Sequence, residues 1–360
     1  MIVGILGGGQ LARMLALAGI PLGMRFVILD PAPDACGGAL GEHILAAYDD
    51  PSALARLAER CDRITYEFEN VPASAVEWLA SQERVVHPPP RALAVARDRL
   101  REKALFGELG IPTAGVEQVE DLPSLRRAVE AVGLPAVLKT RTLGYDGKGQ
   151  VVLSQTQDIE DAWQRLSGVP AVLEAFVPFE REVSIIAVRG AGGQTSFYPL
   201  SENIHREGIL VLARSRPGDP QQTRAEEYAT RLLDALDYRG VLTVEFFDRD
   251  GELLANEIAP RVHNSGHWTI EGAVTSQFEN HLRAVTDLPL GSTSPIGHAA
   301  MLNLIGDVPD PAPLLNLAGV HLHLYDKSSR PGRKVGHVTV RADTPESLDA
   351  LVADVTAICA

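Results

Sequence analysis

The chain begins with MIVGILGGGQLARMLALAGIPLGMRFVILD, residues 1–30, in which an apolar run meets three consecutive glycines before a helix-like stretch. A second apolar run ends at Asp30. Gly7, Gly9 and Ala12 fit the glycine fingerprint G-x-G-x-x-A of a dinucleotide-binding strand–turn–helix, which carries an acidic residue about 20 positions later. The stretch predicts a Rossmann-like βαβ start and leaves open whether this domain binds NAD or has another use.

The same alternation of strands and helices continues to about residue 90. It predicts an α/β fold with a parallel sheet covered by helices on both faces. The run His87-Pro88-Pro89-Pro90 stops the pattern, so we expect the first domain to span residues 1–90. The expected strands are Ile2–Leu6, Arg25–Leu29, Arg63–Tyr66 and Val85–His87, and the expected helices are Pro51–Arg60 and Ala73–Ser81.

Three further parts follow the prolines. Residues 91–187 begin with a helix-like stretch, Arg91–Leu109, and continue as strands and helices around a glycine-rich centre. Residues 188–300 are expected to form a second strand-rich subdomain, and residues 301–360 a small C-terminal α+β region. The expected strands of the later parts are Glu182–Val188, Gly240–Phe247, Leu253–Ile258, Val320–Tyr325 and Lys334–Val340, with helices over Arg224–Leu236 and from Pro345 onward.

The composition excludes several classes of protein. A hydrophobic fraction of 45% over 360 residues supplies real cores, and no stretch offers the ~18 uninterrupted apolar residues of a membrane span. The net charge of −14 disfavours nucleic acid as a partner. The N-terminus lacks the basic region of a signal peptide, and three scattered cysteines suit a reducing compartment. We therefore expect a cytoplasmic protein with no membrane or nucleic-acid partner.

The most informative stretch is AVLKTRTLGYDGKGQVV, residues 136–152. A strand delivers Lys139, a loop with three glycines follows, and a second strand leaves the loop. Glycines let backbone N–H groups turn toward an anion, and Lys148 adds charge inside the loop. Because the loop joins strand to strand, it is neither a P-loop nor a dinucleotide turn. The alternative interpretation is a mobile hairpin with incidental lysines.

Two later strands each carry a carboxylate among apolar residues. They are GVLTVEFF (240–247) and LLANEIAPR (253–261), and as a hairpin they would bring Glu245 close to Glu257. An unpaired charge in an apolar strand is costly, whereas two carboxylates beside the amide of Asn256 suit Mg²⁺ on phosphate oxygens. The alternative is a pair of solvent-facing strand residues.

Two weaker signals flank this hairpin. The polar run after Glu257 includes Arg261, His263 and Asn264, whose donors suit a small oxyanion such as bicarbonate or phosphate. The run EAFV at 174–177, with Glu182 shortly after, offers a strand edge for an adenine ring and a carboxylate for ribose hydroxyls. Alone, the first is an ordinary solvated loop and the second an ordinary strand end.

Together these residues resemble the ATP-grasp ligases and, within them, the N5-carboxyaminoimidazole ribonucleotide synthase family. The resemblance runs essentially from residue 1 to residue 360, without a visible departure from the family's motifs. In that superfamily the Rossmann-like start faces the acceptor substrate and binds no dinucleotide, which argues against NAD. The motifs are GGGQLARM (7–14), YEFENV (66–71), GYDGKGQ (144–150), APRVHNSGHWT (259–269) and RPGRKVGH (330–337).

The resemblance implies an ATP-grasp fold with a pre-ATP-grasp domain at residues 1–90, a lid subdomain within 91–187, a catalytic subdomain at 188–300 and a C-terminal α+β region. It also implies roles for single residues. ATP contacts are expected at Arg99, Lys139, Gly144, Tyr145, Asp146, Gly147, Lys148, Gly149, Gln150, Glu174, Ala175, Phe176, Val177, Glu182, His205, Asn256 and Glu257. Metal ligands are expected at Glu245 and Glu257, and ribonucleotide contacts at Gln10, Leu11, Glu67, Lys327, Arg333 and Lys334. Lys139, Lys148, Arg261, His263 and Asn264 are expected to be catalytic, the last three at the bicarbonate end.

The implied reaction is the ATP- and bicarbonate-dependent carboxylation of 5-aminoimidazole ribonucleotide in purine biosynthesis, through carboxyphosphate or the CO₂ that it releases. It uses Mg²⁺, for which Mn²⁺ can substitute, and no biotin, in a cytoplasmic homodimer. One rival is the formate-dependent glycinamide ribonucleotide transformylase of the same superfamily, which formate dependence would reveal. An NAD-dependent oxidoreductase would bind NAD instead of ATP. A non-catalytic nucleotide-binding regulator is disfavoured by the intact pair Glu245 and Glu257.

Overall fold

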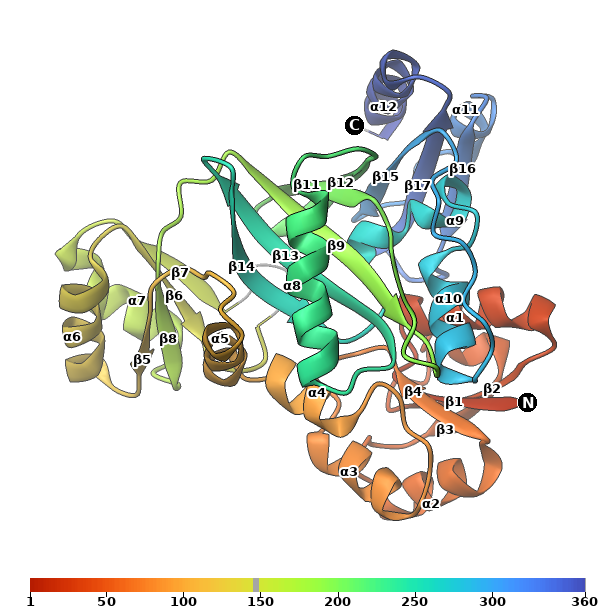
Figure 1. The fold of residues 1–360 in the computed structure, drawn as a ribbon, viewed down its shortest axis with the longest axis horizontal. Coiled ribbons are helices and arrows are strands. Elements are labelled where there is room, and N and C mark those ends of the chain that lie inside the picture. The colour runs from red at the N-terminus through yellow and green to blue at the C-terminus, as the bar shows by residue number, and fades with distance from the viewer. Residues whose placement is uncertain (145–148, 360) are drawn as a thin grey trace.

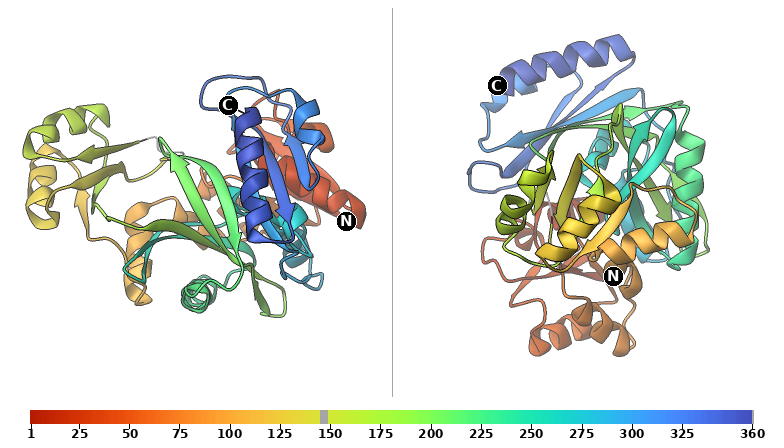
Figure 2. Two further views of the ribbon diagram at one scale, coloured as in Figure 1. Left: turned by 90° about the horizontal axis from the view of Figure 1, so that it is seen from above. Right: turned by 90° about the vertical axis from the view of Figure 1, so that its left-hand side faces the viewer.

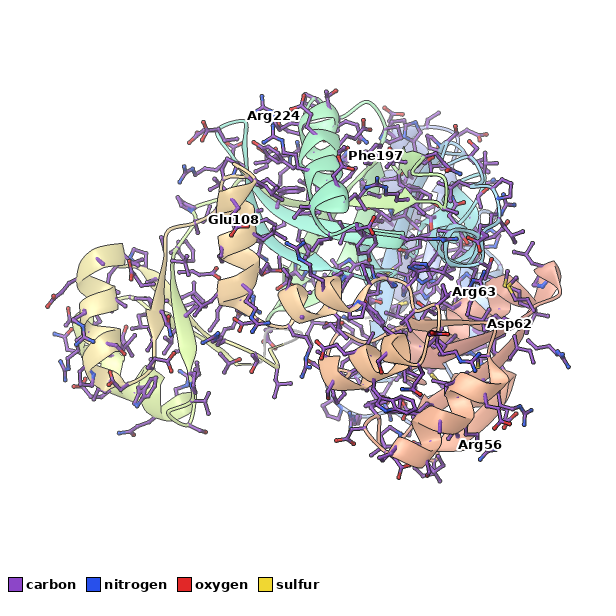
Figure 3. All side chains as sticks on the ribbon, turned by 60° about the horizontal axis from the view of Figure 1, so that its bottom comes forward. Arg56, Asp62, Arg63, Glu108, Phe197 and Arg224 are labelled. Atoms are coloured by element: carbon purple, nitrogen blue, oxygen red, sulfur yellow. The ribbon has the colours of Figure 1, made fainter. Side chains whose placement is uncertain are left out.

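The computed structural model describes residues 1–144 and 149–359. The strands of these residues form three sheets, and helices pack around them (Figures 1 and 2). Charged side chains such as those of Arg56, Glu108 and Arg224 lie on the outer faces of helices (Figure 3). Within the described part of the chain, no helix has both the length and the apolar character needed to cross a membrane.

The N-terminal sheet has the order β3-β2-β1-β4, and all its neighbouring strands are parallel. The fold class and the predicted helices of this part are confirmed. The predicted strand Val85–His87 is wrong, because only Val86 forms an isolated bridge, to Ile64, before the prolines remove the backbone donors needed for a ladder. The elements are β1 (Ile2–Leu6), α1 (Gln10–Gly19), β2 (Arg25–Asp30), β3 (Glu42–Leu45), α2 (Pro51–Arg60), β4 (Arg63–Tyr66) and α3 (Ala73–Ser81).

The predicted continuous helix Arg91–Leu109 is instead two helices, α4 (Pro90–Ala96) and α5 (Arg99–Glu108). Asp98 causes the break: its carboxylate accepts from the N–H of Leu100 and caps α5. The same carboxylate forms a bidentate pair with Arg141, whose Nη2 lies 2.7 Å from Oδ2. The break therefore ties the start of α5 to the segment that enters the glycine-rich loop.

The second sheet, β5-β8-β6-β7, lies at one end of the molecule with α6 and α7 against it (Figure 1). The β6/β7 hairpin confirms the strand–loop–strand interpretation, with Lys139 paired to Gln150 across its base. The loop residues Tyr145, Asp146, Gly147 and Lys148 lie outside the described residues. The elements are β5 (Val116–Val119), α6 (Leu122–Val132), β6 (Ala136–Thr140), β7 (Gln150–Leu153), α7 (Ile159–Arg165) and β8 (Ala171–Ala175).

The central sheet has nine strands in the order β14-β13-β9-β11-β12-β15-β17-β16, with β10 paired to β9. The predicted boundary at residue 187 falls inside β9, and the strands after residue 298 continue this sheet through the β12–β15 pairing. The elements are β9 (Arg181–Arg189), β10 (Thr195–Phe197), β11 (Leu200–Arg206), β12 (Ile209–Arg216), α8 (Gln222–Ala235), β13 (Gly240–Arg249), β14 (Glu252–Ala259), α9 (Thr269–Gly272), α10 (Gln277–Val285), β15 (His298–Ile305), α11 (Pro311–Leu315), β16 (Val320–Leu324), β17 (Lys334–Ala342) and α12 (Pro345–Cys359).

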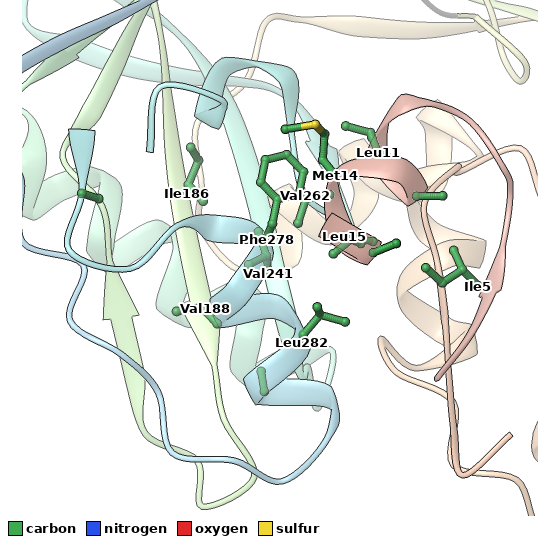
Figure 4. Close-up of a cluster of buried hydrophobic side chains, with 14 of the residues drawn as sticks. Ile5, Leu11, Met14, Leu15, Ile186, Val188, Val241, Val262, Phe278 and Leu282 are labelled. Atoms are coloured by element: carbon green, nitrogen blue, oxygen red, sulfur yellow. The ribbon is translucent and has the colours of Figure 1, made fainter. Parts of the chain in front are cut away.

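One buried cluster joins the N-terminal and central sheets. Leu11, Met14 and Leu15 of α1 belong to the same cluster as Phe278 and Leu282 of α10 (Figure 4). The two parts of the chain therefore share one core. Burying each such side chain stabilises a fold by roughly 1.5–3 kcal/mol relative to leaving it exposed. The glycine turn at the start of α1 is thereby held in place beside the central sheet.

Candidate active site

The glycine turn of the N-terminal sheet is occupied by the chain's own carboxylates. Glu67 accepts from the N–H of Gly9 at 2.8 Å, and Asp30 accepts from the N–H of Gly8 at 2.7 Å. A Cβ added to Gly7, where φ is +103°, would lie 2.7 Å from Cγ of Glu67. Two carboxylates on the donors that a pyrophosphate would need disfavour that anion, so the fingerprint marks the fold and not an NAD site.

The two predicted carboxylates face each other in the β13/β14 hairpin. Glu245 pairs directly with Glu257, and a β-bulge follows because Phe246 pairs with Ala255 and skips Asn256. Burial and the charge of Glu257 raise the pKa of Glu245 to about 8. The side chain of Glu245 is 14% exposed and that of Glu257 is 41% exposed. Two facing carboxylates that repel each other fit a divalent cation that would neutralise both.

The rest of a cation's coordination shell would come from outside the protein. Within residues 1–144 and 149–359, no group of three or more His, Cys, Asp or Glu side chains is arranged to hold a metal ion. Mg²⁺ commonly takes only one or two protein carboxylates and fills its octahedral shell with phosphate oxygens and water. The pair Glu245 and Glu257 therefore suits a cation that arrives with a nucleotide.

Lys139 lies at the edge of this acidic pair. Its Nζ donates to Oε2 of Glu174 at 2.7 Å and to Oδ1 of Asn256 at 3.4 Å. Burial would raise the pKa of Glu174, but Lys139 and then Lys103 lower it to about 2. The Glu174 side chain is thus committed to lysines, so the backbone of the EAFV run is what remains for an adenine ring.

Helix α5 connects this cluster to β14. Arg99 donates to Oε2 of Glu257 at 3.2 Å, and Lys103 donates to the carbonyl of Asn256 at 2.6 Å. Glu102 accepts from the N–H of Ile258 at 2.7 Å, and burial raises its pKa to about 8. The helix therefore positions both members of the Asn256-Glu257 pair.

The polar loop after β14 is held from the N-terminal part of the chain. Arg261 donates from Nε and Nη2 to the carboxylate of Glu69, with 2.9 Å for the Nη2 contact, and from Nη1 to the carbonyl of Val262 at 3.0 Å. These contacts leave one hydrogen on each Nη, and such guanidinium hydrogens suit an oxyanion. Burial would raise the pKa of Glu69, but Arg261 lowers it below its ordinary value.

His263 lies between the polar loop and the acidic pair. Its Nε2 is 3.2 Å from Oε1 of Glu245, and its Nδ1 accepts from the N–H of Ser265 at 3.3 Å. Burial and the charge of Arg261 lower its pKa well below the ordinary value, which favours the neutral ring. A neutral ring whose Nδ1 accepts carries its proton on Nε2, which faces Glu245.

Glu182 and His205 form a second contact beside the acidic pair. Nδ1 of His205 lies 3.2 Å from Oε1 of Glu182. Although burial opposes it, the hydrogen bond and the charge of Glu182 raise the pKa of His205. Both residues also act electrostatically on Glu245, so the structure brings them to the same region as the metal-type carboxylates.

The predicted ribonucleotide contacts converge only in part. Lys327 donates to the side chain of Gln10. Burial raises the pKa of Glu67, although the charges of Arg261 and Lys327 partly oppose this shift. Leu11 is buried in the core, which leaves only its backbone N–H in the first turn of α1 for a ligand. Arg333 donates to Ser328 at the surface.

Two further members of the predicted sets are Lys334 and Phe176. Lys334, at the start of β17, acts electrostatically on Glu69 and His263. Phe176, after β8, is 44% exposed, so its ring is not packed in the core. A pocket between the N-terminal part and the glycine-rich hairpin is lined by Glu69, Arg97, Arg99, Arg141, Gly144 and Glu257 among others.

Several residues that shape the site were not predicted. Glu69 lies inside the YEFENV motif, and that motif was the signal that could have identified it as a site residue. Glu102 and Lys103 have the appearance of ordinary helix residues and offered no such signal. Asn303 hydrogen-bonds to Asn264 from β15, and its only signal is a polar residue inside the apolar run that follows His298. None of the four could be assigned a partner from sequence spacing, because the partners lie 39 to 192 residues away.

Family comparisons define the class of protein first. Residues 104–278 match the ATP-grasp domain, and residues 1–97 match the ribonucleotide synthetase preATP-grasp domain. Residues 299–351 match the phosphoribosylaminoimidazole carboxylase C-terminal domain. The fold is therefore an ATP-grasp fold with a pre-ATP-grasp domain in front, as the resemblance implied.

Whole-chain relatives define the family. The chain is 57% identical over 358 residues to an N5-carboxyaminoimidazole ribonucleotide synthase of Pseudomonas aeruginosa, covering 99% of both chains. It superposes on the crystal structure of the N5-carboxyaminoimidazole ribonucleotide synthetase from Thermus thermophilus with a TM-score of 0.95, at 52% identity and with 99% and 98% of the chains covered. An Aspergillus clavatus synthase, solved with ADP and 5-aminoimidazole ribonucleotide, gives 0.91 at 32% identity, covering 99% of both chains. The chain belongs to the N5-carboxyaminoimidazole ribonucleotide synthase family.

Proposed function

We propose that the chain is an ADP-forming ligase that carboxylates 5-aminoimidazole ribonucleotide with ATP and bicarbonate, giving N5-carboxyaminoimidazole ribonucleotide in purine biosynthesis. One observation carries the proposal: the β13/β14 carboxylate pair, with Lys139 and Arg99, lies directly beside the oxyanion-type loop of Arg261 and His263. A nucleotide site and an oxyanion site in contact are what an ATP-driven activation of bicarbonate requires. ATP complexes and ADP complexes of relatives support the nucleotide part.

The reaction divides into two bond exchanges. A bicarbonate oxygen attacks the γ-phosphorus of ATP, the bond to the bridging oxygen breaks, and ADP leaves with carboxyphosphate formed. The exocyclic amine of the ribonucleotide then forms a C–N bond to the carboxyl carbon, of carboxyphosphate or of the CO₂ that it releases, while phosphate leaves and the amine loses a proton. Positioning and charge neutralisation contribute most to such phosphoryl transfers.

The side chains divide the work accordingly. Mg²⁺, or Mn²⁺ in its place, would be held by Glu245 and Glu257 and would neutralise charge on the phosphate oxygens. Lys139 neutralises a further phosphate oxygen and orients it, and the free Nη fork of Arg261 binds the bicarbonate. His263 donates from Nε2 toward Glu245 and the adjacent phosphate region. Exclusion of water from the site protects the labile carboxyphosphate.

The predicted roles of the glycine-rich loop remain a proposal. Gly149, with φ of +73°, directly precedes the return strand β7, and a Cβ there would lie 2.7 Å from Oγ1 of Thr140, so a side chain would strain the hairpin. We propose that residues 144–150, with Lys148, cover the phosphates as a lid. The four-part division into acceptor-binding, lid, catalytic and C-terminal parts, the homodimer and the cytoplasmic location are proposed on the family resemblance.

Phosphate release tests the function directly. We expect rapid ADP and phosphate formation only when ATP, bicarbonate and 5-aminoimidazole ribonucleotide are present together, in CO₂-depleted buffer to which bicarbonate is added back. Formate with glycinamide ribonucleotide serves as the matched control, because it is what the transformylase would use. Turnover with formate, or no response to bicarbonate, would overturn the proposal, and binding of NAD would restore the oxidoreductase alternative.

The basic C-terminal cluster gives a separate prediction. We expect Lys327→Ala to raise the KM for 5-aminoimidazole ribonucleotide by roughly 10–100-fold, the equivalent of one charge-assisted contact of about 1.5–3 kcal/mol, with the KM for ATP little changed. Arg333→Ala should act in the same direction but less strongly, because Arg333 is bonded to Ser328 at the surface. Initial rates at varied ribonucleotide provide the measurement.

Arg341→Ala provides the control for this cluster. Arg341 is an exposed cation on the same strand, β17, and lies seven residues beyond its first residue, Lys334. We expect its KM values to match those of the unaltered chain. A larger rise in the KM for ATP than for the ribonucleotide in Lys327→Ala would place this cluster in the nucleotide site instead.

A further inference from the structure

Two asparagine side chains from different parts of the chain form a reciprocal pair behind the oxyanion-type loop. Nδ2 of Asn264 donates to Oδ1 of Asn303 at 3.1 Å, and Nδ2 of Asn303 donates to Oδ1 of Asn264 at 2.6 Å. Nδ2 of Asn303 also donates to the backbone carbonyl of Leu210 at 2.8 Å. Both hydrogens of the Asn303 amide are thereby used.

The carbonyl of Leu210 decides how both amides are turned. A backbone carbonyl only accepts, so it must meet the NH₂ group of Asn303; the flipped amide would place two acceptors against each other. Once Asn303 is set, its Oδ1 requires the NH₂ group of Asn264. Leu210 and Asn303 lie on β12 and β15, which pair directly at Leu212 and Leu302, so the sheet itself holds this arrangement.

The consequence concerns what Asn264 offers to a ligand. Its carbonyl oxygen already accepts from Asn303 and one of its amide hydrogens is used, which leaves its second amide hydrogen as the donor that it can offer to a ligand. The two polar side chains that precede it in this loop, Arg261 and His263, also carry donors, and Nε2 of His263 lies 3.2 Å from Oε1 of Glu245. A donor suits an oxyanion, whereas a flipped Asn264 would present a carbonyl that repels it.

We propose that Asn303 is a positioning residue that holds Asn264 as a hydrogen-bond donor and so tunes the oxyanion site for bicarbonate and the activated carboxyl group. Asn303 acts through Asn264 and does not itself touch the substrate. The proposal rests on the proposed function and adds a specificity element from the C-terminal strand β15. Asn303 is itself partly buried, so its amide would be costly without these partners.

A double-mutant cycle tests this action of one residue through another. We expect Asn303→Ala to raise the KM for bicarbonate by about tenfold, as loss of an outer partner commonly does, while the KM for ATP stays within about twofold. In an Asn264→Ala background, adding Asn303→Ala should change the KM for bicarbonate no further. An equal effect of Asn303→Ala in both backgrounds, or equal changes in both KM values, would overturn the proposal.

Two further variants separate positioning from loss of structure. Asn303→Ser keeps a hydroxyl donor for the Leu210 carbonyl but removes the amide pair, so it should reproduce the bicarbonate defect with less loss of thermal stability. Asn316→Ala, at an exposed position after α11, is the matched control and should behave as the unaltered chain. If the unaltered chain shows no bicarbonate-dependent turnover, the proposed function fails; if it does and Asn303→Ser has a normal KM, only the positioning role fails.

Discussion

Replacing Glu257 by Gln is expected to lower the rate of ADP formation by about 100-fold or more at ordinary Mg²⁺ concentration, since even outer partners of a metal change activity by about 10–100-fold. Glu257 faces Glu245 across the hairpin and meets Arg99 at 3.2 Å. Removing its charge takes away half of the negative site for a divalent cation. Rates measured over a range of Mg²⁺ should show a rightward shift of the activation curve.

The same substitution should leave the fold intact. Burial and then the charge of Glu257 raise the pKa of Glu245, so the change relieves a repulsion while it removes one charged partner of Arg99. We expect the melting temperature to stay within about 2 °C of the unaltered chain, because about 1 kcal/mol shifts the melting temperature of a protein of this size by only about 1–2 °C. Glu252→Gln, at an exposed position on the same strand, is the control. Activity of Glu257→Gln within a few-fold of that control would contradict the metal assignment.

Replacing Lys139 by Met is expected to lower kcat/KM for ATP by about 100-fold or more, as loss of one preorganised charge-stabilising donor commonly does. The structure offers a competing role, because the contacts of Nζ are to Glu174 and Asn256 and belong to the fold. If Lys139 serves only as the partner of Glu174, the variant should lose stability and keep its rate.

Lys103→Met distinguishes the two roles. Lys103 also pairs with Glu174, at 3.5 Å, but its shortest contact is to the backbone carbonyl of Asn256. We expect it to lose about 1–3 kcal/mol of unfolding free energy, because the partly buried carbonyl of Asn256 loses its donor. Lys139→Met should lose less stability, since Lys103 still partners Glu174, but more activity. Denaturant unfolding and initial rates on both variants provide the comparison, and the reverse order would show that Lys139 is structural.

Most of the regular elements could be predicted from the sequence because their causes are local. The helices Pro51–Arg60 and Ala73–Ser81 and the strand Arg63–Tyr66 have the predicted bounds. The error at Arg91–Leu109 arose where a side chain caps one helix and binds a distant arginine. Apolar periodicity continues through such a break, so the periodicity cannot reveal where one helix ends and the next begins.

In the candidate site, too, features with local causes could be predicted from the sequence, whereas features set by distant contacts could not. The facing of Glu245 and Glu257 follows from two apolar strands joined by a short turn, and it was predicted. Strand alternation would place Asn256 and Glu257 on opposite faces of the sheet. The bulge in β14 instead lets Asn256 reach Lys139 while Glu257 meets Arg99. No sequence pattern beyond the Asn256-Glu257 motif indicates that a bulge changes the direction of these side chains.

The sequence by itself determined the parallel N-terminal sheet, the lysine hairpin and the acidic hairpin, because hydrophobic periodicity and turn chemistry act over a few residues. It also determined the family, through motifs spread along the whole chain. Only the tertiary structure decided that Glu67 and Asp30 fill the glycine turn and that Glu69 and Asn303 orient Arg261 and Asn264. These contacts join residues that are far apart in the chain, and the direction in which an arginine fork or an amide presents its donors is set by the partner behind it.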